Sequence, residues 1–196
     1  MDLYLNKVNS GKSFPFPELP AYETPRLWLR EMRPETLRFL LKKADQSAAR
    51  KFLNIRTDKE WQHEQKKLKK GYTTWMQSFC IFLIFDKITD ELIGRCGFHT
   101  WIILHRRAEI GYALNSDKWK RMGFMSEAMK FVIGYGFERL NLNRIEASIS
   151  PTNEASLKLA KKFDFVEEGL MRHHYLRNDI TEDSLLFSLI RAELPK

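Results

Sequence analysis

Two short stretches of the sequence place a glycine and polar side chains where helices are expected to begin. In WKRMGFMSEA, residues 119–128, Gly123 stands just before a helical run and follows Lys120 and Arg121. A helix N-terminus presents unpaired backbone N–H groups and the positive end of the helix dipole, and a glycine there lets an anion approach closely. The stretch therefore indicates a phosphate site. Taken alone, a tight turn with ordinary surface charges is the more economical explanation.

The second stretch, SPTNEASLKLAKKF, has Asn153 and Ser156 three residues apart at a helix start. That spacing puts both side chains on one face of the helix, within reach of the same ligand. Both residue types are also common helix caps, which is their default role. Because the two helices follow successive strands, their N-termini can open on one edge of a sheet. An elongated ligand that carries phosphate groups would then lie between them.

Hydrophobic periodicity predicts the elements that hold these helix starts. The buried runs indicate three consecutive antiparallel strands, and the order β-α-α-β-β-β-α-β-α-β-β predicts an α+β fold with a mixed sheet flanked by helices. The strands are expected at 26–32, 78–86, 92–102, 106–114, 144–150, 165–176 and 183–190, and the helices from Pro34 through Leu41, within 57–75, and at 123–139 and 153–163.

Composition bounds the organisation of the chain. With 196 residues, of which 43% are hydrophobic, the chain can bury one sizeable core. Four of the seven prolines lie in residues 15–25, so we expect an extended N-terminal arm over 1–25 and one domain over 26–196.

Charge and cysteine usage narrow the class of protein. The net charge of +8 favours an anionic partner in general. Cys80 and Cys96 lack the spacing of a disulfide framework or a zinc site, so we expect no metal and a reducing compartment. The chain has no signal-like start and no apolar run of about 18 residues, so we expect a cytoplasmic protein away from the membrane.

Five segments in order carry a resemblance to a known family. AEIGYAL, GFMSEAM, NRIEASISPTNEAS, KKFDFVEEG and LRND resemble the GNAT acetyl-CoA-dependent N-acetyltransferases, particularly the RimJ/RimL-like group that acetylates the N-termini of ribosomal proteins. The similarity runs from about Arg26 to Ile190. It implies the GNAT fold, a mixed and mostly antiparallel sheet flanked by helices, with acetyl-CoA as co-substrate.

The resemblance also implies a role for each matching residue. Asn153 would hydrogen-bond the pantetheine arm and Ser156 would face the sulfur. Many relatives use a tyrosine seven residues after the asparagine as general acid, but this chain has Ala160 there, so Ser156 becomes the candidate. The acyl and pantetheine contacts would come from the backbone near Gly111, Tyr112 and Leu114, and the pyrophosphate contacts from Lys120, Arg121, Met122, Gly123, Phe124, Met125 and Ser126.

Some positions depart from the family pattern. The phosphate loop keeps one glycine of the usual set, with Lys120 at its first position and Met125 at its last, and Asp164 replaces the glycine expected before Phe165. These departures bear on how the cofactor is held more than on the fold.

Direct acyl transfer needs a neutral amine, a polarised carbonyl and a proton for the leaving thiolate. In the family that the chain resembles, the strand that matches EIGYAL splays from its neighbour, and its backbone N–H groups would stabilise the oxyanion while Ser156 would protonate the sulfur. Glu109 is the candidate acceptor of the amine proton, with a structural carboxylate as its alternative role. Tyr175 and His174 are second choices, and His99 is expected to be an ordinary polar residue.

The amine chemistry ranks the acceptors. Deprotonation at pH 7 costs about 1.4 kcal/mol for an α-amine with a pKa near ~8, against about 4.6 kcal/mol for a lysine near ~10.4. We therefore expect the N-terminal α-amine of a protein or peptide, with polyamines, amino acids and aminoglycosides as alternatives.

Two other classes of function remain open. One is a catalytically silent acyl-CoA sensor, and the other is a basic nucleic-acid-binding module that uses the lysines of 66–70. Nucleic acid is the less favoured partner, and either a monomer or a homodimer is expected.

Overall fold

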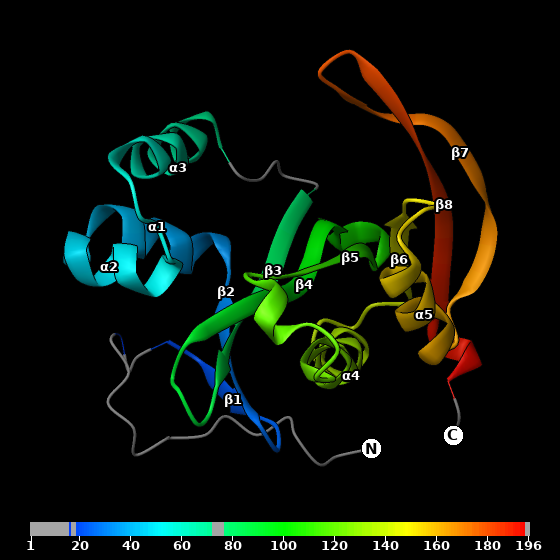
Figure 1. Cartoon of the computed structure of the whole chain (residues 1–196), viewed down its shortest axis with the longest axis horizontal. Coiled ribbons are helices and arrows are strands. Elements are labelled where there is room, and N and C mark those ends of the chain that lie inside the picture. Colours follow the sequence, from blue (N-terminus) through cyan, green and yellow to red (C-terminus); the bar gives the residue numbers. More distant parts are fainter. Residues whose placement is uncertain (1–15, 17–18, 72–76, 195–196) are drawn as a thin grey trace.

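The computed structural model describes residue 16 and residues 19–71 and 77–194 (Figure 1). Within these residues the chain forms one eight-stranded sheet in the order β1-β2-β3-β4-β5-β6-β8-β7. The strands are β1 (Ala21–Glu23), β2 (Leu27–Met32), β3 (Gln77–Asp86), β4 (Leu92–Ile102), β5 (Arg107–Leu114), β6 (Arg144–Ile149), β7 (Val166–Arg177) and β8 (Ile180–Ile190). The helices are α1 (Pro34–Lys42), α2 (Gln46–Leu53), α3 (Asp58–Lys70), α4 (Phe124–Glu138) and α5 (Glu154–Lys162), with 3-10 turns at η1 (Ile103–His105), η2 (Asp117–Trp119) and η3 (Arg191–Glu193).

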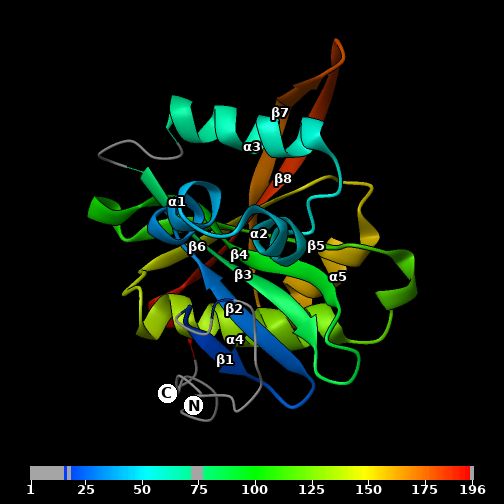
Figure 2. The ribbon, with the colours of Figure 1, turned by 90° about the vertical axis from the view of Figure 1, so that its left-hand side faces the viewer.

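Helices cover both faces of the sheet, as the alternation of β3 shows. Phe82 and Ile84 belong to the core beneath α4, whereas Leu83 and Phe85 belong to a second core beneath α1–α3. Successive side chains of a strand point to opposite faces, so one strand contributes to both cores. Figure 2 shows α4 on the far side of the strands from α1–α3. The expected α+β architecture with a mixed sheet is confirmed.

The expected antiparallel arrangement of three consecutive strands is also confirmed. β3 pairs with β4, and β4 pairs with β5, both antiparallel. Asn178 and Asp179 form the expected turn between β7 and β8, and both have positive φ (49° and 61°). Asparagine and aspartate tolerate that conformation better than most residues.

Two elements differ from the sequence expectation. β1 lies within the segment expected to be an extended arm, yet it pairs antiparallel with β2, and Tyr22 is buried. The Tyr22 hydroxyl donates to the buried Glu31 carboxylate at 3.0 Å, which ties the segment to the sheet. The ordered sheet therefore begins before residue 26. Residues 1–15, 17 and 18 of the expected arm lie outside the described part of the chain.

The described residues between β2 and β3 form three helices where two were expected. The additional helix is α2, whose N-cap Asp45 accepts a hydrogen bond from the Ala48 N–H at 2.8 Å. α3 begins at a capping box formed by Thr57 and Glu60, and it ends at Gly71. Tyr72 and Trp75, expected to extend this helix, fall outside the described residues.

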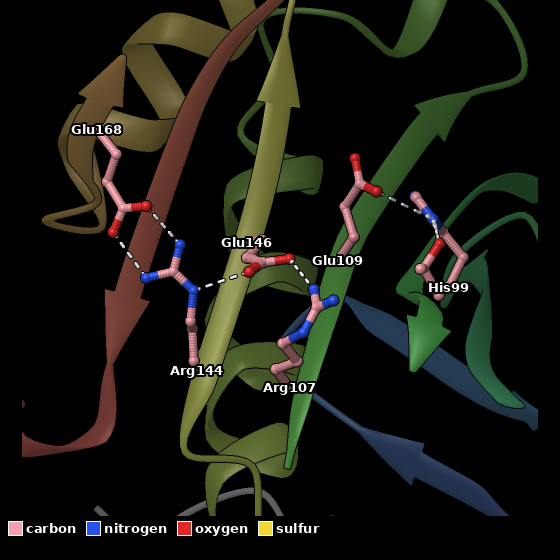
Figure 3. Close-up of polar contacts among 7 residues, drawn as sticks. His99, Arg107, Glu109, Arg144, Glu146 and Glu168 are labelled. Atoms are coloured by element: carbon pink, nitrogen blue, oxygen red, sulfur yellow. Dashed lines mark hydrogen bonds and ion pairs between the residues drawn. The ribbon is translucent and has the colours of Figure 1, made fainter. Parts of the chain in front are cut away.

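β5 and β6 form the parallel pair in the sheet, and they stay together over a short length. Arg107–Glu109 pair with Arg144–Glu146, after which the partners part. β5 continues beside β4 as far as Leu114, while β6 continues beside β8 as far as Ile149. The sheet is thus splayed open toward the carboxyl ends of these two strands (Figure 3).

None of the helices in the described ranges is long and apolar enough to cross a membrane.

Candidate active site

The splayed ends of β5 and β6 bring the two predicted helix starts to one edge of the sheet. Parallel strands end on the same side, α4 follows β5, and α5 follows β6. The first N–H groups of a helix have no partner within that helix, so both starts supply donors for an anion or a carbonyl.

α4 begins at a glycine in the left-handed conformation. Gly123 has φ 79° and is the N-cap, with no side chain capping the helix. Arg26 lies beside it, donates from Nη1 to the Met122 carbonyl at 2.9 Å, and stacks over the Phe124 ring at 4.5 Å. The backbone donors at this start are therefore not occupied by a capping side chain, as a phosphate site requires.

The positive charge expected near the start of α4 is partly neutralised by a carboxylate. Lys120 forms an ion pair with Asp117 at 2.7 Å, and hydrogen bonding from Lys120 lowers the pKa of Asp117. Both side chains are largely exposed, so the pair is free to exchange partners. Arg121 has φ 62°, an uncommon conformation for a residue with a side chain.

Glu127 anchors the first turn of α4 to the turn between β1 and β2. Its carboxylate accepts hydrogen bonds from the Thr24 hydroxyl at 2.6 Å, the Arg26 N–H at 2.8 Å and Arg26 Nε at 2.6 Å. Burial alone would raise the pKa of Glu127, but these bonds outweigh burial and lower it. The turn between β1 and β2 thus fixes where α4 begins.

α5 begins at the predicted pair. Asn153 Oδ1 accepts from the Ser156 N–H at 3.1 Å, so the default capping role is present. The amide nitrogen of Asn153 takes no part in this bond. The Ser156 hydroxyl lies beside Tyr112, close enough to lower the pKa of that phenol, although burial is the larger effect and the net shift is upward.

The side chain of Tyr112 is a site residue that the sequence did not indicate. The resemblance implies contacts from the backbone of Tyr112 alone. In the structure its buried Oη lies near the N-terminus of α5, where it has no well-formed hydrogen bond. Its raised pKa keeps the phenol protonated at neutral pH. A buried hydroxyl of this kind costs about 1–3 kcal/mol unless a ligand completes it.

The other face of β5 carries the predicted proton acceptor. Glu109 lies opposite His99 of β4, and its Oε2 is 3.7 Å from His99 Nδ1 (Figure 3). Tyr175 of β7 has a raised pKa, caused first by burial and then by the charge of Glu109. Glu109 is therefore close enough to both His99 and Tyr175 to act on them electrostatically.

A pocket of about 690 Å³ lies between α3 and the face of β3 and β4 that carries His99. His99 and Thr100 form part of its wall. Its lining combines apolar residues, among them Leu37, Leu53, Ile55, Ile81 and Leu83, with polar and charged ones, among them Glu60, His63, Glu64, Lys67 and Arg95.

Both carboxylates of this pocket have partners. Glu60 Oε2 accepts the backbone N–H groups of Arg56 at 2.7 Å and Thr57 at 3.0 Å, and Glu64 pairs with Lys67 at 2.8 Å.

An ion-pair network closes the narrow end of the splay (Figure 3). Arg107 of β5 contacts Glu146 of β6 at 2.7 Å, and Arg144 contacts both Glu146 at 2.8 Å and Glu168 of β7 at 2.5 Å. Hydrogen bonding from Arg144 lowers the pKa of Glu168 to about 2. These pairs hold the strands together where the parallel ladder is short.

Comparison with known proteins agrees with this geometry. A family model described as an acetyltransferase (GNAT) domain matches residues 26–166. The chain is 38% identical over 172 residues to the uncharacterized N-acetyltransferase p20 of Bacillus licheniformis, covering 87% of this chain and 96% of that protein. It is 30% identical over 110 residues to the ribosomal-protein-serine acetyltransferase of Escherichia coli (strain K12), covering 56% and 60%.

Solved structures show the same fold. The crystal structure of the spermidine/spermine N-acetyltransferase SpeG from Vibrio cholerae matches with a TM-score of 0.62 at 20% identity, covering 86% of this chain and 94% of that one. Together with the splayed parallel pair and the two helix starts that follow it, these matches show that the chain belongs to the GNAT family of acetyl-CoA-dependent N-acetyltransferases, and that its relatives include the RimJ/RimL-like enzymes.

Proposed function

We propose that this protein transfers the acetyl group of acetyl-CoA to the N-terminal α-amine of a protein or peptide. The observation that carries the proposal is the meeting of Tyr112 and Ser156 between β5 and α5, beside an uncapped start of α4. It supplies proton donors for a thiolate and backbone donors for a pyrophosphate on one edge of the sheet.

The chain's own residues divide the chemistry between the two faces of β5. The N–H groups of α4 near Gly123, with Lys120 and Arg121, bind the diphosphate. Backbone N–H groups of β5 beyond Glu109, where β6 has departed, stabilise the oxyanion. As the carbon–sulfur bond breaks, Ser156 or Tyr112 gives a proton to the sulfur. The amine proton leaves on the opposite face, where Glu109 lies.

The pocket beneath α3 supports a peptide over a polyamine. A polyamine carries several ammonium groups, and each buried ammonium needs a carboxylate to offset its lost hydration. Glu60 and Glu64 are already engaged, and the same lining contains the cations Lys67 and Arg95. The N-terminus of a peptide has a single amine to deprotonate. An apolar side chain on its first residue would pack against the apolar residues of the pocket lining.

We also propose that the catalytic domain is a single unit reaching from the β1 segment to the end of β8. The continuous eight-stranded sheet supports this assignment. A silent acyl-CoA sensor would share this architecture, so activity has to be measured directly.

The test has two parts. Isothermal titration with acetyl-CoA should show saturable binding, and mass spectrometry should show a gain of one acetyl group on peptides with free α-amines. The acceptor panel includes the same peptides with blocked N-termini, spermidine, free amino acids and an aminoglycoside. Faster transfer to spermidine than to every peptide would contradict the proposed acceptor, and binding with no transfer to any amine would favour the sensor.

A further inference from the structure

We propose that His99 takes the proton from the acceptor's ammonium group and that Glu109 orients it. The inference rests on the proposed function for the identity of the acceptor, but the His99–Glu109 pair concerns any amine that this site acetylates. In the step, an N–H bond of the ammonium breaks, its electron pair stays on the nitrogen, and the proton moves to Nε2 of His99. The resulting imidazolium faces the Glu109 carboxylate.

The register of the sheet places the two residues together. His99 of β4 and Glu109 of β5 are directly paired in the antiparallel ladder, so their side chains lie on the same face. His99 Nδ1 lies 3.7 Å from Glu109 Oε2 (Figure 3). It also lies 3.2 Å from Thr100 Oγ1. With Nδ1 directed at these oxygens, Nε2 is the nitrogen left to receive a proton.

Gly111 lets the imidazole of His99 lie against the backbone of β5. A Cβ built on Gly111 would come within 2.8 Å of both Cδ2 and Nε2 of His99. That separation is shorter than real side chains adopt, so the ring occupies the space that any other residue at 111 would fill. Nε2 therefore faces the segment of β5 from which β6 has already separated.

A bulge next to His99 has an unusual backbone conformation. The ladder between β4 and β5 slips between His99 and Ile102, and Thr100 has φ 50°. Positive φ is strained for a β-branched residue, and such strain gathers where a side chain must be aimed. The bulge thus lies at the pocket, where Thr100 belongs to the lining and its hydroxyl contacts His99.

The pocket provides access for the amine and an exit for the proton. His99 and Thr100 line the pocket of about 690 Å³, and the His99 side chain is 45% exposed. Further charged or titratable groups face this space from neighbouring elements: Arg95 from β4, Glu60, His63, Glu64 and Lys67 from α3, and Tyr175 of β7 beyond Glu109. Among the groups in the described part of the chain, Glu109 is the one that forms an ion-pair contact with the His99 imidazole.

The experiment compares His99→Gln, Glu109→Gln and the double variant with wild type. Rates are measured from pH 5.5 to 9 with whichever amine of the panel the wild type acetylates. We expect His99→Gln to lower kcat about 100-fold and to flatten the acidic limb of the pH profile, with acetyl-CoA affinity unchanged. The double variant should lose little more than His99→Gln alone, because the two residues act as one unit.

The control is His105→Gln, the same substitution on an exposed histidine in the loop that joins β4 to β5. It should keep the wild-type rate and pH profile. The inference is overturned if His99→Gln keeps the wild-type pH profile, or if its loss of rate comes with an equal loss of acetyl-CoA affinity. Absence of transfer to α-amines with transfer to another amine overturns only the proposed acceptor.

Discussion

Tyr112 and Ser156 come from different elements, and in the proposed mechanism one of their hydroxyls gives its proton to the sulfur. Because the two interact, we expect them to work as a short donor chain to the thiolate. Tyr112→Phe and Ser156→Ala should each lower kcat roughly 10-fold to 100-fold while acetyl-CoA affinity stays within a few-fold of wild type. Single-turnover kinetics and calorimetry separate these two quantities.

The double variant Tyr112→Phe/Ser156→Ala tests whether the hydroxyls act together. A shared path predicts that the double variant loses no more than the worse single variant, whereas independent roles predict multiplied losses. Tyr175→Phe provides the comparison on the amine side, and it should change the basic limb of the pH profile rather than the release of the thiol. Full turnover in Ser156→Ala would remove its assigned role.

For single residues, the sequence predicts which side chains of one helix lie together better than it predicts which side chains of different elements meet. Asn153 and Ser156 share a helix face because of their spacing, which the sequence contains. The approach of Tyr112 to Ser156, and of His99 to Glu109, depends on strand register and on a bulge at Thr100. Register follows from long-range pairing, so His99 was expected to be an ordinary polar residue.

Among the elements, α4 owes its starting point to Glu127 and the turn between β1 and β2. The pKa of Glu127 is lowered below its ordinary value of 4.5, so the native state favours the carboxylate. Its contribution to stability is complete above the unfolded-state pKa and declines as pH falls through the lower folded-state pKa. Glu127→Gln should therefore reduce the melting temperature at pH 7 and have less effect as the pH drops below 4.

Thermal unfolding across pH 3–8 measures this effect, with Glu91→Gln as control. Glu91 pairs with Lys118 at 2.6 Å, but both side chains are more than half exposed, so its loss should change stability little. We also expect Glu127→Gln to weaken acetyl-CoA binding, because the N–H groups of α4 lose their fixed position. A melting temperature equal to wild type at pH 7 would contradict this account of Glu127.

Most elements were predictable because their pattern of hydrophobic residues repeats over many positions. α4, α5 and the strands β3, β4 and β5 lie close to their expected ranges. β1 and α2 were missed for a physical reason. β1 has three residues and depends on pairing with β2 and on the bond from Tyr22 to Glu31, while α2 buries only Ala49 and Phe52 among its residues. Such short elements are stabilised by tertiary contacts rather than by local pattern.

Across the whole molecule, function depends on a sheet that is closed at one end and open at the other. The parallel order of β5 and β6 was predictable from the strand–helix–strand pattern, because such a crossover joins parallel strands. The length of their pairing was not, since it ends after Glu109 and is reinforced by ion pairs between residues far apart in the sequence. The opening itself is therefore a property of the folded chain.

Glu168 offers a test of how strongly the narrow end is held. Its pKa of about 2 lies below the ordinary value of 4.5, so its stabilising effect is complete above pH 4.5 and is lost as pH falls toward 2. The side chain is 34% exposed, and solvent screening limits the effect of Glu168→Gln to about 1 kcal/mol at pH 7. Urea unfolding at pH 7 and pH 2.5 should show a smaller difference between variant and wild type at the lower pH.

The control is Glu154→Gln, which breaks an exposed pair with Lys158 at 3.7 Å and should match wild type at both pH values. An equal loss at the two pH values would mean that the charge of Glu168 does not hold β7 to β6, and that packing closes the narrow end.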